Sequence, residues 1–238
     1  MTDEDTAATT AGDPAGGTWT RVTPAGCYAA VGRASEDDPV ARALLALLCE
    51  AAAPAWDAEA HGSLARAGLL ERVAGPERVP ATPLERLLPE LLPALSDRGQ
   101  VVLSESRQGL FLDSAGLSRE DAERLAVTGS GLQALLGGDR LLPDARLGVD
   151  SAALAIVDAS GHAEVGFWPL HVGRYVFMLT VFGVPRLNTD EFRRLAWTLQ
   201  QRYGTEAPAP GGGAGIGAAY AGPETPGGDG PAGPGHAS

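Results

Sequence analysis

Apolar and polar positions between residues 82 and 204 alternate in a pattern that predicts strands and helices in a definite order. Two β-type runs, 101–103 and 110–112, flank a polar turn at 107–109 and predict a hairpin. Alanine and leucine then recur at helical spacing over 119–136. Ser118, with Asp121 three residues later, forms a weak capping box at the start of this helix.

Three more strands follow in the sequence. They are expected at 152–157, which we interpret as buried, at 164–168 and at 174–182, with 169–173 joining the last two. The hairpin connections are too short for parallel crossovers, so the strands must run antiparallel. The expected fold class is therefore α+β, with a five-stranded antiparallel sheet flanked by helices.

Helices are also expected at both ends of this region. The first should begin with Thr82 as N-cap and Pro83 as its first residue, and should be short or broken because of Pro89 and Pro93. The last should begin at Asn188 and carry an apolar stripe formed by Phe192, Leu195, Ala196, Leu199 and Tyr203.

Residues 18–81 predict a smaller, mostly helical module. Short strands are expected at 19–23 and 27–32, a helix from Pro39, and another helix that covers 63–70 and ends near Gly75 and Pro76. A degenerate copy of the hairpin-helix motif and a winged-helix-like module both remain open. A DNA-binding stripe is weakened by acidic residues that alternate with the arginines, namely Glu59, Arg66, Glu71, Arg72, Glu77 and Arg78.

The two ends of the chain are expected to be disordered. Residues 1–17 are acidic, and residues 205–238 are rich in Gly, Pro and Ala, so neither can bury enough apolar surface to offset chain entropy. The expected organisation is a disordered head 1–17, a module 18–81, a sheet domain 82–204 and a disordered tail 205–238.

The charged residues exclude several classes of protein. All 18 basic residues are arginine, so the chain has neither a Walker A phosphate loop nor a Schiff-base lysine. The net charge of −12 disfavours nucleic acid and anionic lipid as partners. We expect no secretory leader, because residues 1–5 contain neither a basic nor an apolar stretch. The longest nearly uncharged apolar run, 175–184, is too short to span a bilayer. We expect a cytoplasmic protein in which Cys27 and Cys49 are reduced, buried thiols.

Three sets of chemically suggestive residues are interpreted as structural. The G-x-G-x-x-A pattern at 213–218 has no strand before it and no helix after it. The four histidines are too scattered for a metal site. Asp158, Ser160 and His162 lie too close in sequence to converge as a triad, and His162 is interpreted as a solvated turn residue. We expect no catalytic residue, no cofactor and no bound metal.

The residues GLFLDSAGL at 109–117, followed by DAERLA at 121–126 and SGLQAL at 130–135, resemble the roadblock, or dynein light chain, family. The bacterial members look most similar, and the likeness covers about half of the chain. It implies a roadblock/longin/profilin-like fold and a non-enzymatic interaction protein. It also implies a homodimer that binds, regulates or scaffolds a small Ras-like GTPase.

The resemblance further implies where these contacts lie. Dimerisation is expected through the middle helix and the strand at 152–157, with interface candidates Leu125, Gly129, Leu132, Gln133, Ala153 and Ala155. Gly129 and Gly131 are explained if another backbone approaches closely, although a glycine-rich chain can also simply tolerate them. Partner-binding candidates on the exposed side of the helix are Arg119, Glu120, Glu123, Arg124 and Val127. Pairing of Glu120 with Arg124 within the helix explains these charges equally well.

Other interpretations stay open. Trp168 and Trp197 either anchor a partner or pack against residues 18–81. A transcription-associated regulator would use residues 18–81 to bind DNA or a partner, while the sheet domain dimerises. A small-molecule sensor would need a preformed apolar pocket.

Overall fold

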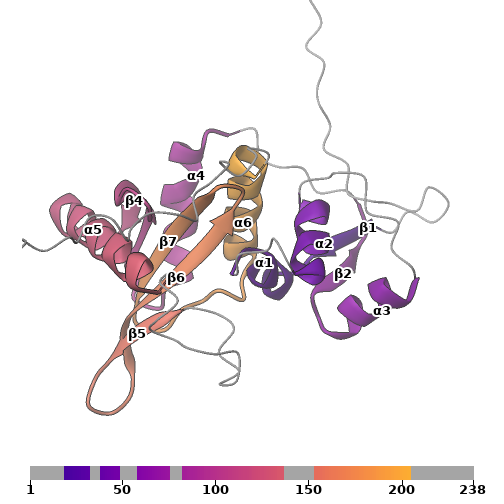
Figure 1. Cartoon of the computed structure of the whole chain (residues 1–238), viewed down its shortest axis with the longest axis horizontal. Helices are drawn as coiled ribbons and strands as arrows, with labels where there is room; N and C mark the ends of the chain where they lie inside the picture. Colours follow the sequence, from indigo (N-terminus) through magenta and orange to yellow (C-terminus); the bar gives the residue numbers. More distant parts are fainter. Residues whose placement is uncertain (1–18, 33–37, 49–57, 76–81, 137–152, 205–238) are drawn as a thin grey trace, which may run out of the picture. The chain divides into compact units, whose positions relative to one another are not determined.

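A computed structural model describes residues 19–32, 38–48, 58–75, 82–136 and 153–204 (Figure 1). The expected five-stranded antiparallel sheet is confirmed, with the strand order β4-β3-β7-β6-β5. Both predicted tails and Cys49 lie outside the described residues. The elements of the sheet domain are α4 (Leu84–Leu91), the 3-10 turn η1 (Leu92–Leu95), β3 (Val101–Glu105), β4 (Leu110–Ala115), α5 (Arg119–Leu136), β5 (Leu154–Val157), β6 (Ala163–Val172), β7 (Tyr175–Phe182) and α6 (Asp190–Tyr203).

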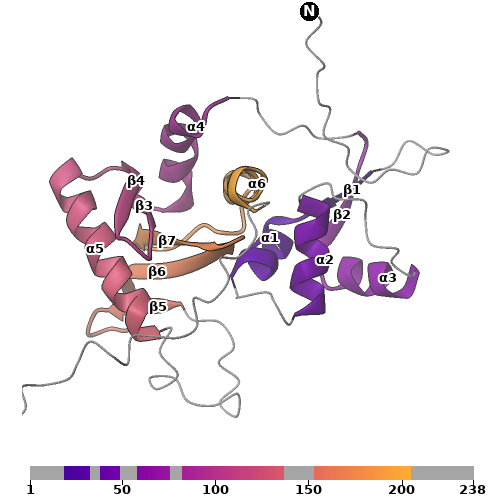
Figure 2. The same ribbon diagram turned by 45° about the horizontal axis from the view of Figure 1, so that its top comes forward.

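Helices cover both faces of this sheet. The helix α5 lies on one face, and α4 and α6 lie on the other (Figure 2). Alternation along the strands separates the two sides, because successive side chains of a strand point to opposite faces. Leu103 and Leu179 join the core under α4 and α6, whereas Phe167 and Met178 pack on the α5 side.

The helix starts differ slightly from expectation. The capping box of α5 is confirmed: the Asp121 amide donates to Ser118 Oγ at 3.1 Å. At α4 the N-cap is Pro83 rather than Thr82, and no side chain caps the helix. The α6 cap is Thr189, one residue after the expected Asn188, and its hydroxyl accepts from the Phe192 amide at 3.4 Å.

Two predictions about proline are settled by the backbone. The short first helix is confirmed, since α4 contains Pro89 and gives way to η1, which contains Pro93. The connection expected at 169–173 is wrong, because β6 continues through Pro169 to Val172. Pro169 pairs with Met178 of β7, while β5 reaches only as far as Phe167 on the other side of β6. Pro169 thus lies where its missing donor leaves no neighbouring strand unpaired.

The N-terminal module combines a two-stranded sheet with three helices: β1 (Trp19–Val22), α1 (Pro24–Val31), α2 (Pro39–Leu48), α3 (Ala58–Arg66) and β2 (Leu70–Val73). The strand expected at 27–32 is wrong, because Thr23 caps a helix there, accepting from the Gly26 amide at 3.1 Å, with Pro24 at the first position. The helix expected to cover 63–70 and to end near Gly75 ends earlier, at Arg66, and 70–73 pairs with β1 instead.

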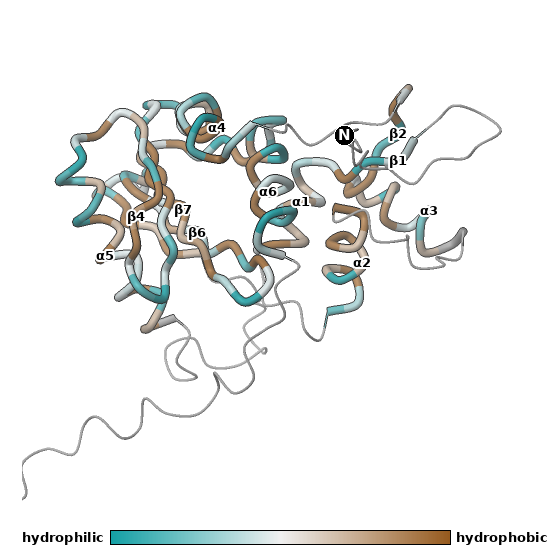
Figure 3. Tube along the Cα trace, turned by 90° about the horizontal axis from the view of Figure 1, so that it is seen from above, coloured by the Kyte–Doolittle hydropathy of each residue, from teal (hydrophilic) through white to brown (hydrophobic). Residues whose placement is uncertain are grey.

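This module shares its core with the sheet domain. The helix α1 packs against both α2 and α6. The rings of Tyr28 and Phe192 lie 6.2 Å apart, and Gln201 Nε2 donates to the Leu48 carbonyl at 2.7 Å. Hydrophobic positions follow both α2 and the central strands (Figure 3). Since α6 is covered by the sheet and by α1, its apolar stripe is buried as expected, and so is Trp197.

Charged groups reinforce this contact at the start of α6. Arg193 Nε donates to Asp190 Oδ1 at 3.0 Å, and Arg21 of β1 approaches the same carboxylate at 3.9 Å. Arg21 also pairs with Glu71 of β2 at 2.6 Å. The Arg193 hydrogen bond, aided by both arginine charges, lowers the pKa of Asp190 below 3.8.

We expect Asp190→Asn to lower the free energy of unfolding by up to about 1 kcal/mol near pH 7, because this carboxylate is largely exposed. A carboxyl group with a lowered folded pKa contributes stability above its unfolded pKa and loses it as the pH falls through the folded value. The difference between parent and variant should therefore shrink below pH 3.8, as urea unfolding at several pH values would measure. A difference that persists unchanged in acid would contradict this origin.

No helix in the described ranges has both the length and the apolar character that a bilayer crossing needs.

Candidate partner-binding surface

The outer face of α5 begins with four exposed, mutually paired charges. Arg119 Nε donates to Glu123 at 2.7 Å, and Arg124 donates to Glu120 at 2.5 Å. The expected pairing of Glu120 with Arg124 is therefore confirmed. Both pairs span one helical turn, where each such contact stabilises a helix by only about 0.2–0.5 kcal/mol. The pairs organise a charged surface and do little for stability.

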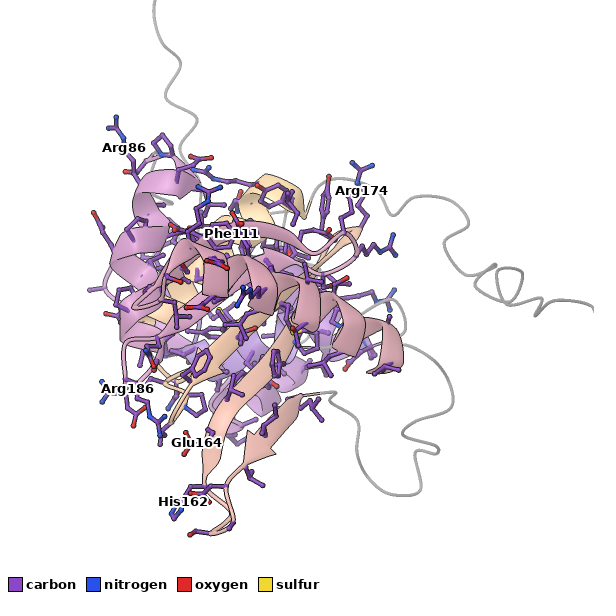
Figure 4. All side chains as sticks on the ribbon, turned by 90° about the vertical axis from the view of Figure 1, so that its left-hand side faces the viewer. Arg86, Phe111, His162, Glu164, Arg174 and Arg186 are labelled. Atoms are coloured by element: carbon purple, nitrogen blue, oxygen red, sulfur yellow. The ribbon has the colours of Figure 1, made fainter. Side chains whose placement is uncertain are left out.

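These charges lie beside β4, which is one edge of the sheet. The Arg119 guanidinium lies 5.8 Å from the centre of the Phe111 ring. Phe111 belongs to β4 and is labelled in Figure 4. Val127 follows on the helix and is 66% exposed. The five predicted partner-binding residues thus share one surface of α5, with a charged end and an apolar continuation.

The interface candidates on α5 lie closer to the sheet. Leu125, Leu132 and Gln133 are half-buried, and Gly129 is buried. A Cβ atom at Gly129 would lie 2.9 Å from the Met178 side chain, so the close approach at this glycine is made by the chain's own sheet. Gly131 has no such neighbour within 4 Å.

The strand β5 forms the opposite edge of the sheet. Its expected burial is wrong: Ala153 and Ala155 are exposed, and Ile156 and Val157 are 54% and 55% exposed. Among the described strands β5 pairs with β6 alone, so its outer edge is unpaired there. An edge strand with exposed apolar side chains is a template for pairing with another chain.

The C-terminal half of α5 borders this same edge. Leu132 packs on Val165 and Phe167 of β6, whose partners on β5 are Ile156 and Leu154. Gly129 lies over the central strand β7, where it faces Met178. Among the α5 candidates, Leu132 therefore borders the same edge as Ala153 and Ala155, which we call the β5 edge. The charged residues 119–124 lie at the other.

Two exposed residues of the β5 edge, Ile156 and Val157, were not among the predicted candidates. The run LAIV indicates a strand but not its place in the sheet, and an apolar run usually indicates burial on both faces. Leu135, 56% exposed near the end of α5, was also missed.

The other chemically suggestive residues serve local structure. Asp158 Oδ1 accepts the backbone amides of Ser160 at 2.8 Å and His162 at 2.9 Å, which forms a turn rather than a triad, and His162 is exposed as expected. Within the described part of the chain, no His, Cys, Asp and Glu side chains gather into a possible metal site. Desolvation lowers the pKa of the half-buried His171 on β6.

Four arginines lie in the described part of the N-terminal module, and Arg42 and Arg72 are exposed. Arg21 pairs with Glu71, and Arg66 Nε donates to the Gly62 carbonyl at 3.2 Å. Arg78 and Glu77 lie outside the described residues. Trp197 is 6% exposed within the shared core, which confirms packing over anchoring, and Trp168 packs against the same core.

No protein-family model and no curated protein matches the chain. Among solved structures it is similar to Myxococcus xanthus MglB, with 19% identity, 52% of this chain and 95% of that chain covered, and a TM-score of 0.34. It is also similar to a Roadblock/LC7 domain from Streptomyces avermitilis, with 16% identity, 51% and 93% coverage, and a TM-score of 0.32. Both are similarities of fold.

Proposed function

We propose that residues 82–204 form a roadblock-like domain and that this protein is a non-enzymatic interaction protein that dimerises and binds a small Ras-like GTPase. The GTPase would supply its own nucleotide pocket. The roadblock-like domain would contribute surface, and would act by binding one conformation of the GTPase switch segments better than the other.

The observation that supports this proposal best is the exposed apolar β5 edge. The α4 and α6 side of the sheet is covered within the chain, because α1 packs on α6 and contributes to the same core. Most of the large apolar side chains that are exposed in the described part of this domain lie on the outer surface of α5 or at the β5 edge, namely Val127, Leu135, Ile156 and Val157, whereas Leu110 and Val184 lie elsewhere. We therefore assign dimerisation to the β5 edge.

The charged end of α5 is the proposed GTPase contact. It lies beside β4, at the opposite edge from β5, so a second copy and a GTPase can bind at the same time. Its charges are of both signs and are exposed. Such a surface selects a complementary partner and governs the association rate more than the affinity. Val127 adds an exposed apolar contact one turn away.

We expect the full-length chain to bind at least one purified small GTPase of its own cell in a nucleotide-dependent manner. Biolayer interferometry would compare GTPases loaded with GDP and with a non-hydrolysable GTP analogue. Arg124→Glu should weaken the favoured complex about tenfold, because it reverses a charge at the proposed contact.

The matched control is Arg42→Glu, which reverses an exposed arginine on α2 of the N-terminal module. It should leave binding unchanged. Equal binding of both nucleotide states, or no binding to any small GTPase, would contradict the proposed function. Equal losses from both variants would contradict the assignment to α5.

A further inference from the structure

The two faces of the five-stranded sheet are filled very differently. On the α4 and α6 side, a large continuous core joins the sheet, the helices α4 and α6, the 3-10 turn η1 and the N-terminal module. On the α5 side, the buried cluster consists of Val165, Phe167 and Met178, with Leu132 and Phe182 packed against it. Burial of apolar surface is the main force that holds an element in place. The helix α5 is therefore held by much less of it than α6.

Two buried hydroxyls lie on the sheet surface that faces α5. Thr180 is on the same side of β7 as Met178, and Ser104 on β3 pairs with Met178. Both residues are at most 1% exposed. Neither hydroxyl oxygen has a hydrogen-bond partner within the described residues. A buried polar group without a partner destabilises the packing of α5 on the sheet, because water would form hydrogen bonds with it if the helix moved away.

The inner surface of α5 also contributes little to its packing on the sheet. Its fully buried residues are Ala122, Ala126 and Gly129, which offer little side-chain area to the sheet. Gln133, one turn further along, is half-buried, and its Oε1 atom also has no hydrogen-bond partner within the described residues. By contrast, the helix itself is well formed at its start, through the Ser118 cap and two ion pairs.

We infer that α5 opens from the sheet as a unit, at a lower free energy than the unfolding of the rest of the domain. Opening exposes few large apolar side chains and hydrates Ser104 and Thr180. It leaves the core under α4 and α6 intact. Only the role of this motion rests on the proposed function. In that role, a protein bound to the outer face of α5 would respond to whether the helix is packed on the sheet or open.

Native-state hydrogen exchange on the full-length chain tests this directly. The amides of 122–133 should exchange about 100-fold faster than those of β7 and α6, since they open sub-globally. Thr180→Val removes one orphan hydroxyl with little change of shape, and should slow α5 exchange about tenfold.

The matched control is Thr198→Val on α6. Thr198 is equally buried, but its hydroxyl donates to the Arg194 carbonyl at 2.7 Å, so its loss should leave α5 exchange unchanged. The inference is overturned if α5 exchanges as slowly as β7 in the parent, or if Thr180→Val does not slow it. The exchange rates are measured without a GTPase and at two protein concentrations, and they should agree. The opening of α5 is thereby tested independently of dimerisation and GTPase binding, which the proposed function requires.

Discussion

Phe192→Ala is expected to lower the free energy of unfolding of the whole chain by about 3–5 kcal/mol, the usual effect of truncating a fully buried aromatic residue. Phe192 is 0% exposed and packs against Tyr28 of the N-terminal module. The substitution should create a cavity where the module meets α6. Urea unfolding followed by circular dichroism would measure the loss, and the transition should remain single, because one core spans both parts of the chain.

Val184→Ala is the control for this prediction. Val184 is 61% exposed, so its truncation should change stability by no more than about 0.5 kcal/mol. If Phe192→Ala instead produced two separate transitions, one of them unchanged from the parent, the N-terminal module would be folding independently of α6. Tyr28→Ala, combined with Phe192→Ala in a double-mutant cycle, should then show no coupling.

The elements with strong local signals could be predicted from the sequence. The hairpin of β3 and β4 and the helix α5 follow from alternation, helical spacing and the Ser118 cap. The stripe on α6 was predicted as well, although burial of Trp197 off that stripe was left open. Its burial depends on α1, which is distant in sequence.

The errors arose where tertiary contacts override the local pattern. Residues 27–32 contain β-type and small side chains, but the cap at Thr23 and Pro24 starts a helix that is apolar on all sides because α2 and α6 cover it. Pro169 was expected to end a strand, yet it lies where β6 has passed the end of β5. Neither circumstance is visible in a local window of sequence.

The candidate surface shows the same limit. The prediction placed one side of α5 correctly on an exposed surface, because helical periodicity indicates which residues share a side of the helix. These exposed residues are Arg119, Glu120, Glu123, Arg124 and Val127. The burial of β5 was predicted wrongly, because exposure of a strand depends on its position in the sheet and not on its own residues. Ile156 and Val157 became candidates only once β5 was found at an edge.

Ile156→Asp is expected to convert a dimer into a monomer, with a dissociation constant raised about 100-fold or more, equivalent to about 2.8 kcal/mol. Ile156 is 54% exposed at the β5 edge, so a charge there is solvated in the single chain and costs little folding stability. In the dimer proposed here the same charge would be buried between two edges without a partner, which is strongly unfavourable. Sedimentation velocity over a range of concentrations would measure the dissociation constant.

Val40→Asp is the matched control, because Val40 is an exposed apolar residue, at 40%, on α2 of the N-terminal module rather than at the β5 edge. It should leave the association unchanged.

Loss of the dimer in both variants would contradict the assignment of the interface to β5. A parent chain that remains monomeric would contradict the dimer in the proposed function. If the parent chain dimerises and the Ile156→Asp variant dimerises equally well, the assignment of the dimer interface to the β5 edge is contradicted. Because the charged end of α5 lies beside β4, at the opposite edge of the sheet from β5, the same variant should leave binding at that end intact, which separates the two proposed contacts.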